Sequence, residues 1–269
     1  MIVTHVSPAH NRFDTRIFLK MCKSLYSDNY DVNFIVADGD GSAQVDGINI
    51  IDCGNFKRPL SKRVFFSLFI LYFKCIKIKS DVYHLHDPDL LFLGLLLKLS
   101  GKKVFFDVHE DFSSQLLSKP YLNMFLSKLF SYIYFKLECF CFKYYDKIFF
   151  ATISIYNKFD KFHYKSIVIN NYPIKNELSI SDIDLVPPQF HIFDKNVSYL
   201  IFVGVISEIR GIREVICSLE FTKNVNLILV GNFSTPSFLK ELESLRTSDG
   251  QNLWDRVIYM GQRNRFEVS

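Results

Sequence analysis

The sequence predicts an α/β protein with two lobes, each built on a parallel sheet covered by helices. Two strand-like runs, Asp81–Asp87 and Lys103–Asp111, flank an apolar stretch of helical length, Leu90–Leu99, that closes with a Ser-Gly pair. Strand, helix, glycine and strand in this order form a βαβ unit, which joins parallel strands. A similar alternation returns after residue 198. It contains fewer strands than the first, so we expect the second lobe to be incomplete.

Length and composition exclude several classes of protein. With 269 residues, the chain lies at the upper limit for one hydrophobic core. Its formal net charge of +4 is too small for a nucleic-acid binder that relies on bulk charge. The six cysteines show no metal-binding spacing and no disulfide framework, and free thiols fit a reducing cytosol. We expect no signal peptide, and no run reaches the roughly 18 apolar residues of a membrane span.

The first lobe is predicted from short β-branched or apolar runs that end at turn residues. The runs are Ile2–Val6, Val32–Ala37, Ile48–Ile51, Asp81–Asp87, Lys103–Asp111, Asp146–Ala151 and Ser166–Asn170. Asp14 or Thr15 would cap the helix that follows the first strand. Residues 38–47 are rich in Gly and Asp and are expected to form a loop.

The lobe boundaries follow from composition. We expect residues 1–173 to form the first lobe, residues 174–196 a linker and residues 197–269 a partial second lobe. The linker is rich in Ser, Asp and Asn and contains Pro187-Pro188. The second lobe has three predicted strands, Tyr199–Val203, Val225–Val230 and Val257–Met260. A doubly wound half normally needs more strands than this to cover both faces of its sheet.

Two segments, residues 57–79 and 119–145, combine lysines with many of the 28 phenylalanines. In the second segment, Lys128, Lys136 and Lys143 fall within roughly 80° of one another on a helix, and the opposite side is expected to carry aromatic and aliphatic residues. Helices of this kind lie at membrane surfaces, with lysines at the headgroups. The alternative is that both helices simply pack inside the protein.

Imidazole and carboxylate side chains gather where two central strands end. One strand ends in His86-Asp87 and the next in His109-Glu110-Asp111. Ligands of open parallel sheets bind at the carboxyl ends of the strands, and histidine exchanges protons near neutral pH. His109 is therefore the first candidate catalytic residue. The alternative is a structural histidine, with Glu110 and Asp111 capping the next helix.

The turn that starts at Gly204 and ends at Arg210-Gly211 joins a strand to a helix. Its backbone N–H groups and the helix dipole would favour a diphosphate, with Arg210 as cationic partner. The turn matches neither a G-x-G-x-x-G motif nor a Walker loop. It could equally be an ordinary strand-to-helix turn with an exposed arginine.

Four stretches in this order resemble the GT-B glycosyltransferases and, within them, the large retaining family 4. They are SPAHNRFDTRIFLKMCKSL, DVYHLHDPDLLFLGLLLKLSGKKVFFDVHED, IVINNYPI, and FVGVISEIRGIREVI followed by LILVG. The similarity runs from Met1 to about Gln262 and points to bacterial enzymes of capsule, O-antigen or exopolysaccharide assembly. It implies two Rossmann-like lobes, with a UDP- or GDP-sugar donor at the second and a lipid-linked saccharide acceptor at the first.

The resemblance also implies roles for individual residues. His109 matches the histidine that contacts the donor sugar near the reacting carbon, and Arg210 matches the basic residue on the donor diphosphate. The implied donor-binding residues are Gly204, Glu208, Arg210 and Gly211. The implied acceptor-binding residues are Asp14, Thr15, Arg16, His86, Asp87 and Glu110. No metal is expected, because the nearest D-x-D pair, Asp87-Pro88-Asp89, is not placed convincingly, and no cofactor is expected beyond the nucleotide sugar.

The chain departs from the family pattern at three places. Val205 stands where relatives often have a second arginine, and Pro-Ala-His-Asn-Arg replaces a Gly-rich first loop. Nothing after Gly261 supplies the acidic E-x7-E segment, so we expect a copy truncated in its donor-binding lobe. The first interpretation is a retaining transferase, cytoplasmic and peripheral on the inner face of the cell membrane. The alternatives are a non-catalytic remnant or partner subunit that binds membrane or another transferase, and a sugar-nucleotide epimerase of the same fold.

Overall fold

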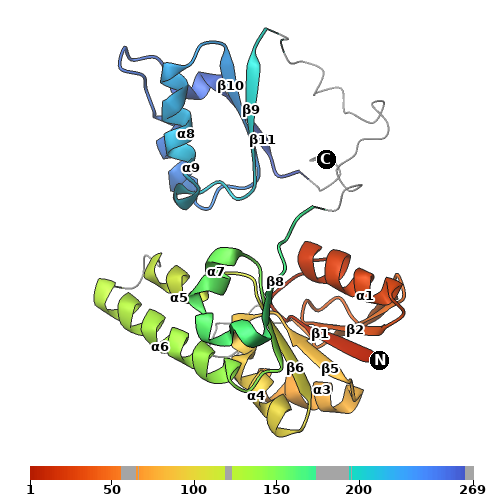
Figure 1. Cartoon of the computed structure of the whole chain (residues 1–269). Coiled ribbons are helices and arrows are strands. Elements are labelled where there is room, and N and C mark those ends of the chain that lie inside the picture. Colours follow the sequence, from red (N-terminus) through yellow and green to blue (C-terminus); the bar gives the residue numbers. More distant parts are fainter. Residues whose placement is uncertain (56–64, 66, 119–122, 174–193, 195, 264–269) are drawn as a thin grey trace. The chain divides into compact units, whose positions relative to one another are not determined.

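The computed structural model describes residues 1–55, 65, 67–118, 123–173, 194 and 196–263. The chain divides into two compact units, Met1–Tyr172 and Pro173–Ser269 (Figure 1), which are considered separately. The expected linker lies almost wholly outside the described residues. Residues 57–64, 66 and 119–122 of the two basic aromatic segments also lie outside them.

An eight-stranded sheet in the order β3-β4-β2-β1-β5-β6-β7-β8 forms the first unit. Its strands are β1 (Ile2–Val6), β2 (Asp31–Val36), β3 (Ala43–Val45), β4 (Ile48–Asp52), β5 (Val82–Leu85), β6 (Lys103–Val108), β7 (Lys147–Phe150) and β8 (Ser166–Val168). All pairs are parallel except β3 with β4. Strands β2 to β4 lie on one side of β1, and β5 to β8 follow on the other side. The strand order therefore reverses between β1 and β5. Ligands of such sheets bind beside this reversal.

Strand β3 corrects the expected loop over residues 38–47. It pairs antiparallel with β4 at the edge of the sheet, joined to it by the turn at Asp46 and Gly47. Both residues have positive φ, 51° and 79°. An Asp-Gly pair with two positive φ angles is the preferred two-residue hairpin turn, so the signal for β3 was present in the sequence.

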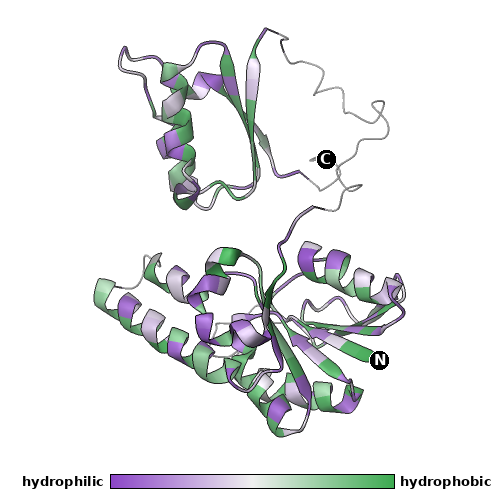
Figure 2. Ribbon diagram, in the orientation of Figure 1, coloured by the Kyte–Doolittle hydropathy of each residue, from purple (hydrophilic) through white to green (hydrophobic). Residues whose placement is uncertain are grey.

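Helices cover both faces of this sheet, and the longest, α6, alternates hydrophobic and hydrophilic turns (Figure 2). The helical segments are η1 (Thr15–Cys22), α1 (Lys23–Ser27), η2 (Ser67–Leu71), α3 (Tyr72–Ile78), η3 (Pro88–Leu90), α4 (Leu91–Leu99), α5 (Phe112–Gln115), η4 (Leu116–Ser118), α6 (Met124–Phe142), α7 (Ile153–Lys158) and η5 (Asp160–Lys165). Asp14, as expected, caps the helix after β1, because its carboxylate accepts hydrogen bonds from the backbone N–H groups of Arg16 and Ile17. The predictions did not include α7 and η5.

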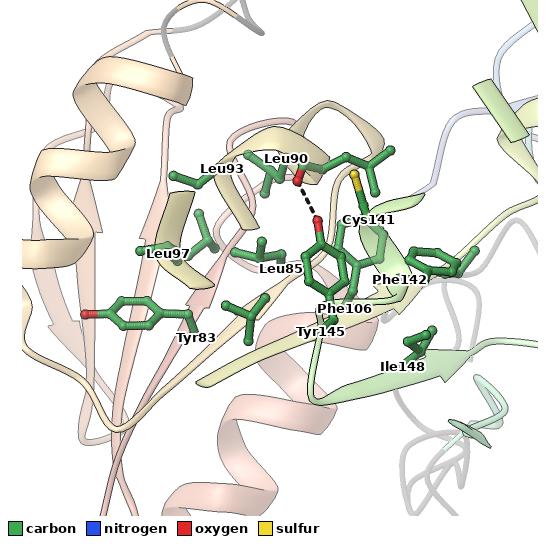
Figure 3. Close-up of a cluster of buried hydrophobic side chains, with 14 of the residues drawn as sticks. Tyr83, Leu85, Leu90, Leu93, Leu97, Phe106, Cys141, Phe142, Tyr145 and Ile148 are labelled. Atoms are coloured by element: carbon green, nitrogen blue, oxygen red, sulfur yellow. Dashed lines mark hydrogen bonds between the residues drawn. The ribbon is translucent and has the colours of Figure 1, made fainter. Parts of the chain in front are cut away.

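Apolar side chains from α4, α6 and the central strands form the larger core (Figure 3). Tyr145 donates a hydrogen bond across it to the carbonyl of Leu91. Gly94, in the middle of an apolar helix, makes this possible, since a Cβ there would lie 2.5 Å from the Tyr145 hydroxyl. On the other face, η1 packs Ile17 and Phe18 against β2 and β4.

Within the described residues, the second unit has three parallel strands in the order β11-β10-β9, and they coincide closely with the three predicted runs. They are β9 (Ser198–Val203), β10 (Val225–Val230) and β11 (Val257–Gly261), and its helical segments are η8 (Glu208–Arg210), α8 (Ile212–Ser218), η9 (Leu219–Phe221), α9 (Pro236–Glu243) and η10 (Leu253–Arg256). Helices α8 and α9 lie on one face of this small sheet (Figure 1). Across the described segments of both units, no helix combines the length and apolarity needed to cross a bilayer.

Candidate functional site

A cleft of about 620 Å³ opens in the first unit where β1 and β5 to β8 end. Its lining includes His10, His86, His109, Glu110, Glu138 and Asn170. Loops after five neighbouring strands therefore contribute to one site, as expected for the carboxyl edge of a parallel sheet. The predicted strand-end residues His86, His109 and Glu110 come together here.

Asp107, a residue that the sequence analysis did not single out, organises the cleft. Its carboxylate is fully buried and accepts two hydrogen bonds from Arg16, at 2.9 Å and 2.8 Å. His109 Nε2 lies 3.0 Å and His86 Nδ1 3.4 Å from its Oδ2 atom. Burial alone would raise the pKa of Asp107, but the contacts with His109, His86 and Arg16 hold it well below the usual range. Asp107 is thus a stable anion beneath the cleft.

His109 is held by this carboxylate. Its Nε2 atom lies within hydrogen-bonding distance of both Asp107 and His86, while its side chain keeps 16% of its surface exposed. Within the described residues, the Nδ1 atom makes no hydrogen bond. A ring fixed through one nitrogen presents the other to a ligand in a defined orientation.

Three further imidazoles extend inward from the cleft as a neutral row. His5 Nδ1 lies 2.8 Å from His86 Nε2, and the His84 ring packs against both rings in a tilted arrangement, at 4.9 Å and 4.4 Å between centroids. Burial, helped by the neighbouring rings, lowers the pKa of His5 and of His84 well below the usual value, and burial also lowers the pKa of His86. His5 and His84 therefore pack behind His86, and because these rings are neutral they add no positive charge near Asp107.

Asp87 anchors the loop after β1. It is fully buried and accepts hydrogen bonds from the Ala9 backbone N–H, at 2.9 Å, and from the Ser7 hydroxyl. His10 Nδ1 lies 2.7 Å from the same carboxylate, and this contact raises the pKa of His10. Burial opposes ionisation of Asp87, but the His10 contact leaves its pKa lowered. Asp87 therefore positions His10, which lines the cleft.

The other predicted acceptor residues differ in how much they offer a ligand. Asp14 lines the cleft and uses an oxygen to cap η1. The guanidinium of Arg16 is buried between Asp107 and the carbonyl of Ile169, at 2.8 Å, so it braces the cleft wall. Glu110 also lines the cleft and accepts a hydrogen bond from Gln115. Thr15 is not among the lining residues. Acceptor contact by these residues remains a prediction.

Glu138 is an acidic residue in the cleft wall that the sequence analysis overlooked. It lies on the inward face of α6, is only 3% exposed, and its Oε2 atom has no hydrogen-bond partner. Burial raises its pKa to about 8, with Lys158 pulling it down and Asp111 pushing it up. The side chain is therefore a neutral carboxylic acid at pH 7. A glutamate among Phe, Tyr, Leu and Cys was the signal that could have identified it.

Two groups of side chains have the spacing of metal ligands in the described part of the chain. One is His5, His84 and His86, and the other is His86, Asp107 and His109. In the second group Arg16 already occupies both oxygens of Asp107, so a cation would stand against a guanidinium. The arrangement fits a hydrogen-bonded imidazole better than a metal ion.

The predicted donor turn in the second unit runs from the end of β9 to α8. Arg210 and Glu208 are exposed in η8, and Gly211 takes the left-handed conformation with φ 69° before α8. The backbone N–H groups of Gly204, Ile206, Arg210 and Gly211 all donate to backbone carbonyls. A phosphate at this turn would thus depend chiefly on the Arg210 side chain and on the first turn of α8.

The turn after β9 packs closely against the turn after β10. A Cβ at Gly231 would lie 1.9 Å from the carbonyl oxygen of Gly204, so only glycine allows the two backbones to approach. Ile206 and Phe233 pair as an isolated parallel bridge just beyond them. The turn is therefore a rigid part of the second unit.

Comparison with protein-family models gives no match, and neither does comparison with curated proteins. Solved structures do resemble the chain. HepE from Anabaena, in complex with UDP and glucose, has a TM-score of 0.66 at 14% identity, covering 99% of this chain and 71% of its own. Sucrose-phosphate synthase from Thermosynechococcus elongatus has a TM-score of 0.68 at 12% identity, covering 98% and 71%.

The lipopolysaccharide outer core galactosyltransferase WaaB, solved in its apo form, gives a TM-score of 0.56 at 15% identity and covers 98% of this chain and 69% of its own. These structures are GT-B glycosyltransferases. The predicted fold class, α/β with two Rossmann-like lobes of the GT-B type, is therefore confirmed.

Proposed function

We propose that this protein is a glycosyltransferase that moves a sugar from a nucleotide-sugar donor to a saccharide acceptor. The cleft at the carboxyl edge of the first sheet, with His109 pinned by Asp107, carries the proposal. Support also comes from the solved structures of the same fold, since HepE holds UDP-glucose in one of them. The donor would be a UDP- or GDP-sugar.

The resemblance to family 4 supports separate roles for Arg210 and His109 in this reaction. Arg210 would stabilise the negative charge that develops on the leaving diphosphate. His109 would contact the donor sugar through its free Nδ1 atom, because Asp107 fixes the opposite nitrogen. The neutral wall formed by Glu138 and its neighbours suits the hydroxyl groups of a saccharide rather than a second charge. By its resemblance to family 4, the reaction would retain the anomeric configuration.

We propose further that the acceptor is lipid-linked and belongs to surface polysaccharide synthesis, such as capsule or O-antigen. The support is the surface of the first unit, where Phe69 and Phe73 of η2 and α3 are 51% and 66% exposed, and Phe125 of α6 is 75% exposed. Large exposed apolar side chains beside lysines suit the surface of a membrane. The corresponding place in the cell is the inner face of the membrane.

The test is a transfer assay with the purified chain. Labelled UDP-glucose, UDP-galactose and GDP-mannose are supplied separately, each with a bacterial lipid extract as acceptor source, and label in the lipid phase is measured. The proposal predicts transfer from at least one donor, with the anomeric configuration retained in the product. Vesicle binding without transfer from any donor would instead support a non-catalytic partner subunit, and isomerisation of the donor an epimerase.

A further inference from the structure

A second cavity of the first unit lies between α6 and η5, apart from the cleft. Its volume is about 400 Å³, and it shares no lining residue with the cleft. Its walls include the rings of Phe135, Phe140, Phe159 and Phe162. Phe140 is 47% exposed, so an apolar surface continues outward from the cavity. We call this cavity the α6 groove.

Three lysines stand around the α6 groove without acidic partners. Lys136, Lys143 and Lys161 are exposed and line the groove. Burial raises the pKa of the Cys139 thiol in the groove wall, and the positive charges of these three lysines lower it. In the described part of the chain, none of their ammonium groups forms a salt bridge. Asp160 is the acidic residue among the lining side chains. The groove thus combines an excess of positive charge with an aromatic interior.

The exposed face of α6 continues this pattern. At about 100° per residue, Lys136 and Lys143 fall on the same side of the helix as five exposed apolar residues. These are Phe125, Leu129, Tyr132, Ile133 and Phe140, with exposures of 75%, 41%, 59%, 51% and 47%. The sequence analysis expected aromatic and aliphatic residues opposite the lysines, and such residues occur on both sides of the helix. The opposite face is the buried one, because Cys141 and Phe142 there pack into the core.

We propose that the α6 groove binds the phosphate headgroup of an acidic membrane lipid. Lys136, Lys143 and Lys161 contact the phosphate, and the phenylalanine walls receive the methylenes that follow it. The site rests on the membrane contact proposed above for α6 and makes that contact selective for lipid charge. Lysines with apolar stems over aromatic rings are suited to an interface where charge and hydrocarbon meet.

The combination of lysines and aromatic walls favours an acidic lipid over other anionic ligands. A free phosphate would use the lysines and leave the aromatic walls without a partner. An acidic protein segment would use both, but the groove is bordered by a helix face of exposed rings that suits hydrocarbon. The experiment below distinguishes the lipid from free phosphate and from an acidic protein segment.

The experiment measures binding of the full-length chain to vesicles by flotation, with no sugar donor present. Vesicles contain phosphatidylcholine alone or phosphatidylcholine with phosphatidylglycerol. The triple variant K136Q/K143Q/K161Q is compared with a control, K103Q/K147Q/K223Q, whose exposed lysines lie outside the groove and outside α6. We expect the groove variant to lose about a hundredfold in partition to the anionic vesicles, and the control to stay within about fivefold of wild type.

Alkylation of Cys139 locates the ligand. Monomeric short-chain phosphatidylglycerol should slow the reaction of Cys139 and leave that of Cys217 in α8 unchanged, and inorganic phosphate at the same concentration should protect neither. Equal losses in the two triple variants would overturn the proposal, as would full protection by phosphate or by an acidic peptide alone. Since no donor is used, absence of sugar transfer would contradict the proposed enzymatic function and leave this result intact.

Discussion

Asp107 shows at the scale of single residues how a buried charge builds a surface site. It sits inside an apolar strand, yet four nitrogen atoms from Arg16, His86 and His109 surround its carboxylate. The sequence itself contains a signal for Asp107. Side chains alternate along a strand, so a residue two places before His109 shares its side of the sheet. An acid there is placed to hold the histidine.

Replacing Asp107 by Asn should destabilise the first unit by about 3–5 kcal/mol, because it removes one partner of a buried ion pair and leaves Arg16 uncompensated. Guanidinium titration followed by far-ultraviolet circular dichroism measures the change. The emission of Trp254, the single tryptophan, reports the second unit and should be unaffected.

The matched control is Asp46→Asn. Asp46 pairs with Lys23 at 2.7 Å on the surface, where both side chains are exposed, so its loss should cost less than about 1 kcal/mol. If the two variants were equally stable, Asp107 would not have the central role described above.

Glu138 gives a pH dependence whose sign is fixed by its burial. Its pKa rises from 4.5 to about 8 in the folded chain, so folding takes up a proton between these values. The stabilising effect of the neutral form is complete below pH 4.5 and is lost as the pH rises toward 8. Each pH unit in this window changes the free energy of unfolding by about 1.4 kcal/mol per proton.

The variant Glu138→Gln keeps a neutral side chain and should remove this slope. The free energy of unfolding of the variant, relative to wild type, should increase from pH 5 to pH 8 and then level off. The exposed Glu243→Gln in α9 serves as control and should show a constant difference. A constant difference for Glu138→Gln as well would mean that Glu138 is ionised in the folded chain.

Helix α6 shows at the scale of elements what a pattern can and cannot predict. Its aromatic and basic composition predicted a long helix, and Met124–Phe142 is one. The pattern did not predict which side faces the core, because apolar residues surround the helix and only packing against the sheet selects a face. Ser127 and Glu138 are buried although polar, while Met124 and Phe125 are exposed although apolar.

The close turns of the second unit predict a strong effect of a single methyl group. Gly231→Ala should destabilise this unit by about 3 kcal/mol or more, because its Cβ would overlap the Gly204 carbonyl and its φ of 139° is unfavourable for alanine. Thermal unfolding followed by Trp254 emission reports this unit directly.

Gly250→Ala is the control for backbone strain alone. Gly250 also has a positive φ, 89°, but open space around its Cβ position, so a loss of about 1 kcal/mol is expected. Similar melting temperatures for the two variants would show that the turns after β9 and β10 separate easily.

At the scale of the whole molecule, local patterns were sufficient for the architecture. Strand, helix and glycine alternation predicted all strands except β3, and the order of motifs predicted the GT-B class. The contacts inside the site could not be predicted from local sequence patterns. Arg16 meets Asp107 across 91 residues of sequence, and His5 meets His86 across 81. No local period relates such pairs, so the strand order had to be known first.

The most direct test of the proposed function compares sugar transfer by wild type and His109→Ala, with nucleotide affinity measured on the same samples. Transfer should fall by about a hundredfold or more while the dissociation constant for the nucleotide changes less than about threefold, because His109 is proposed to act on the sugar and Arg210 on the diphosphate. Transfer by His109→Ala at the wild-type rate would contradict this proposal.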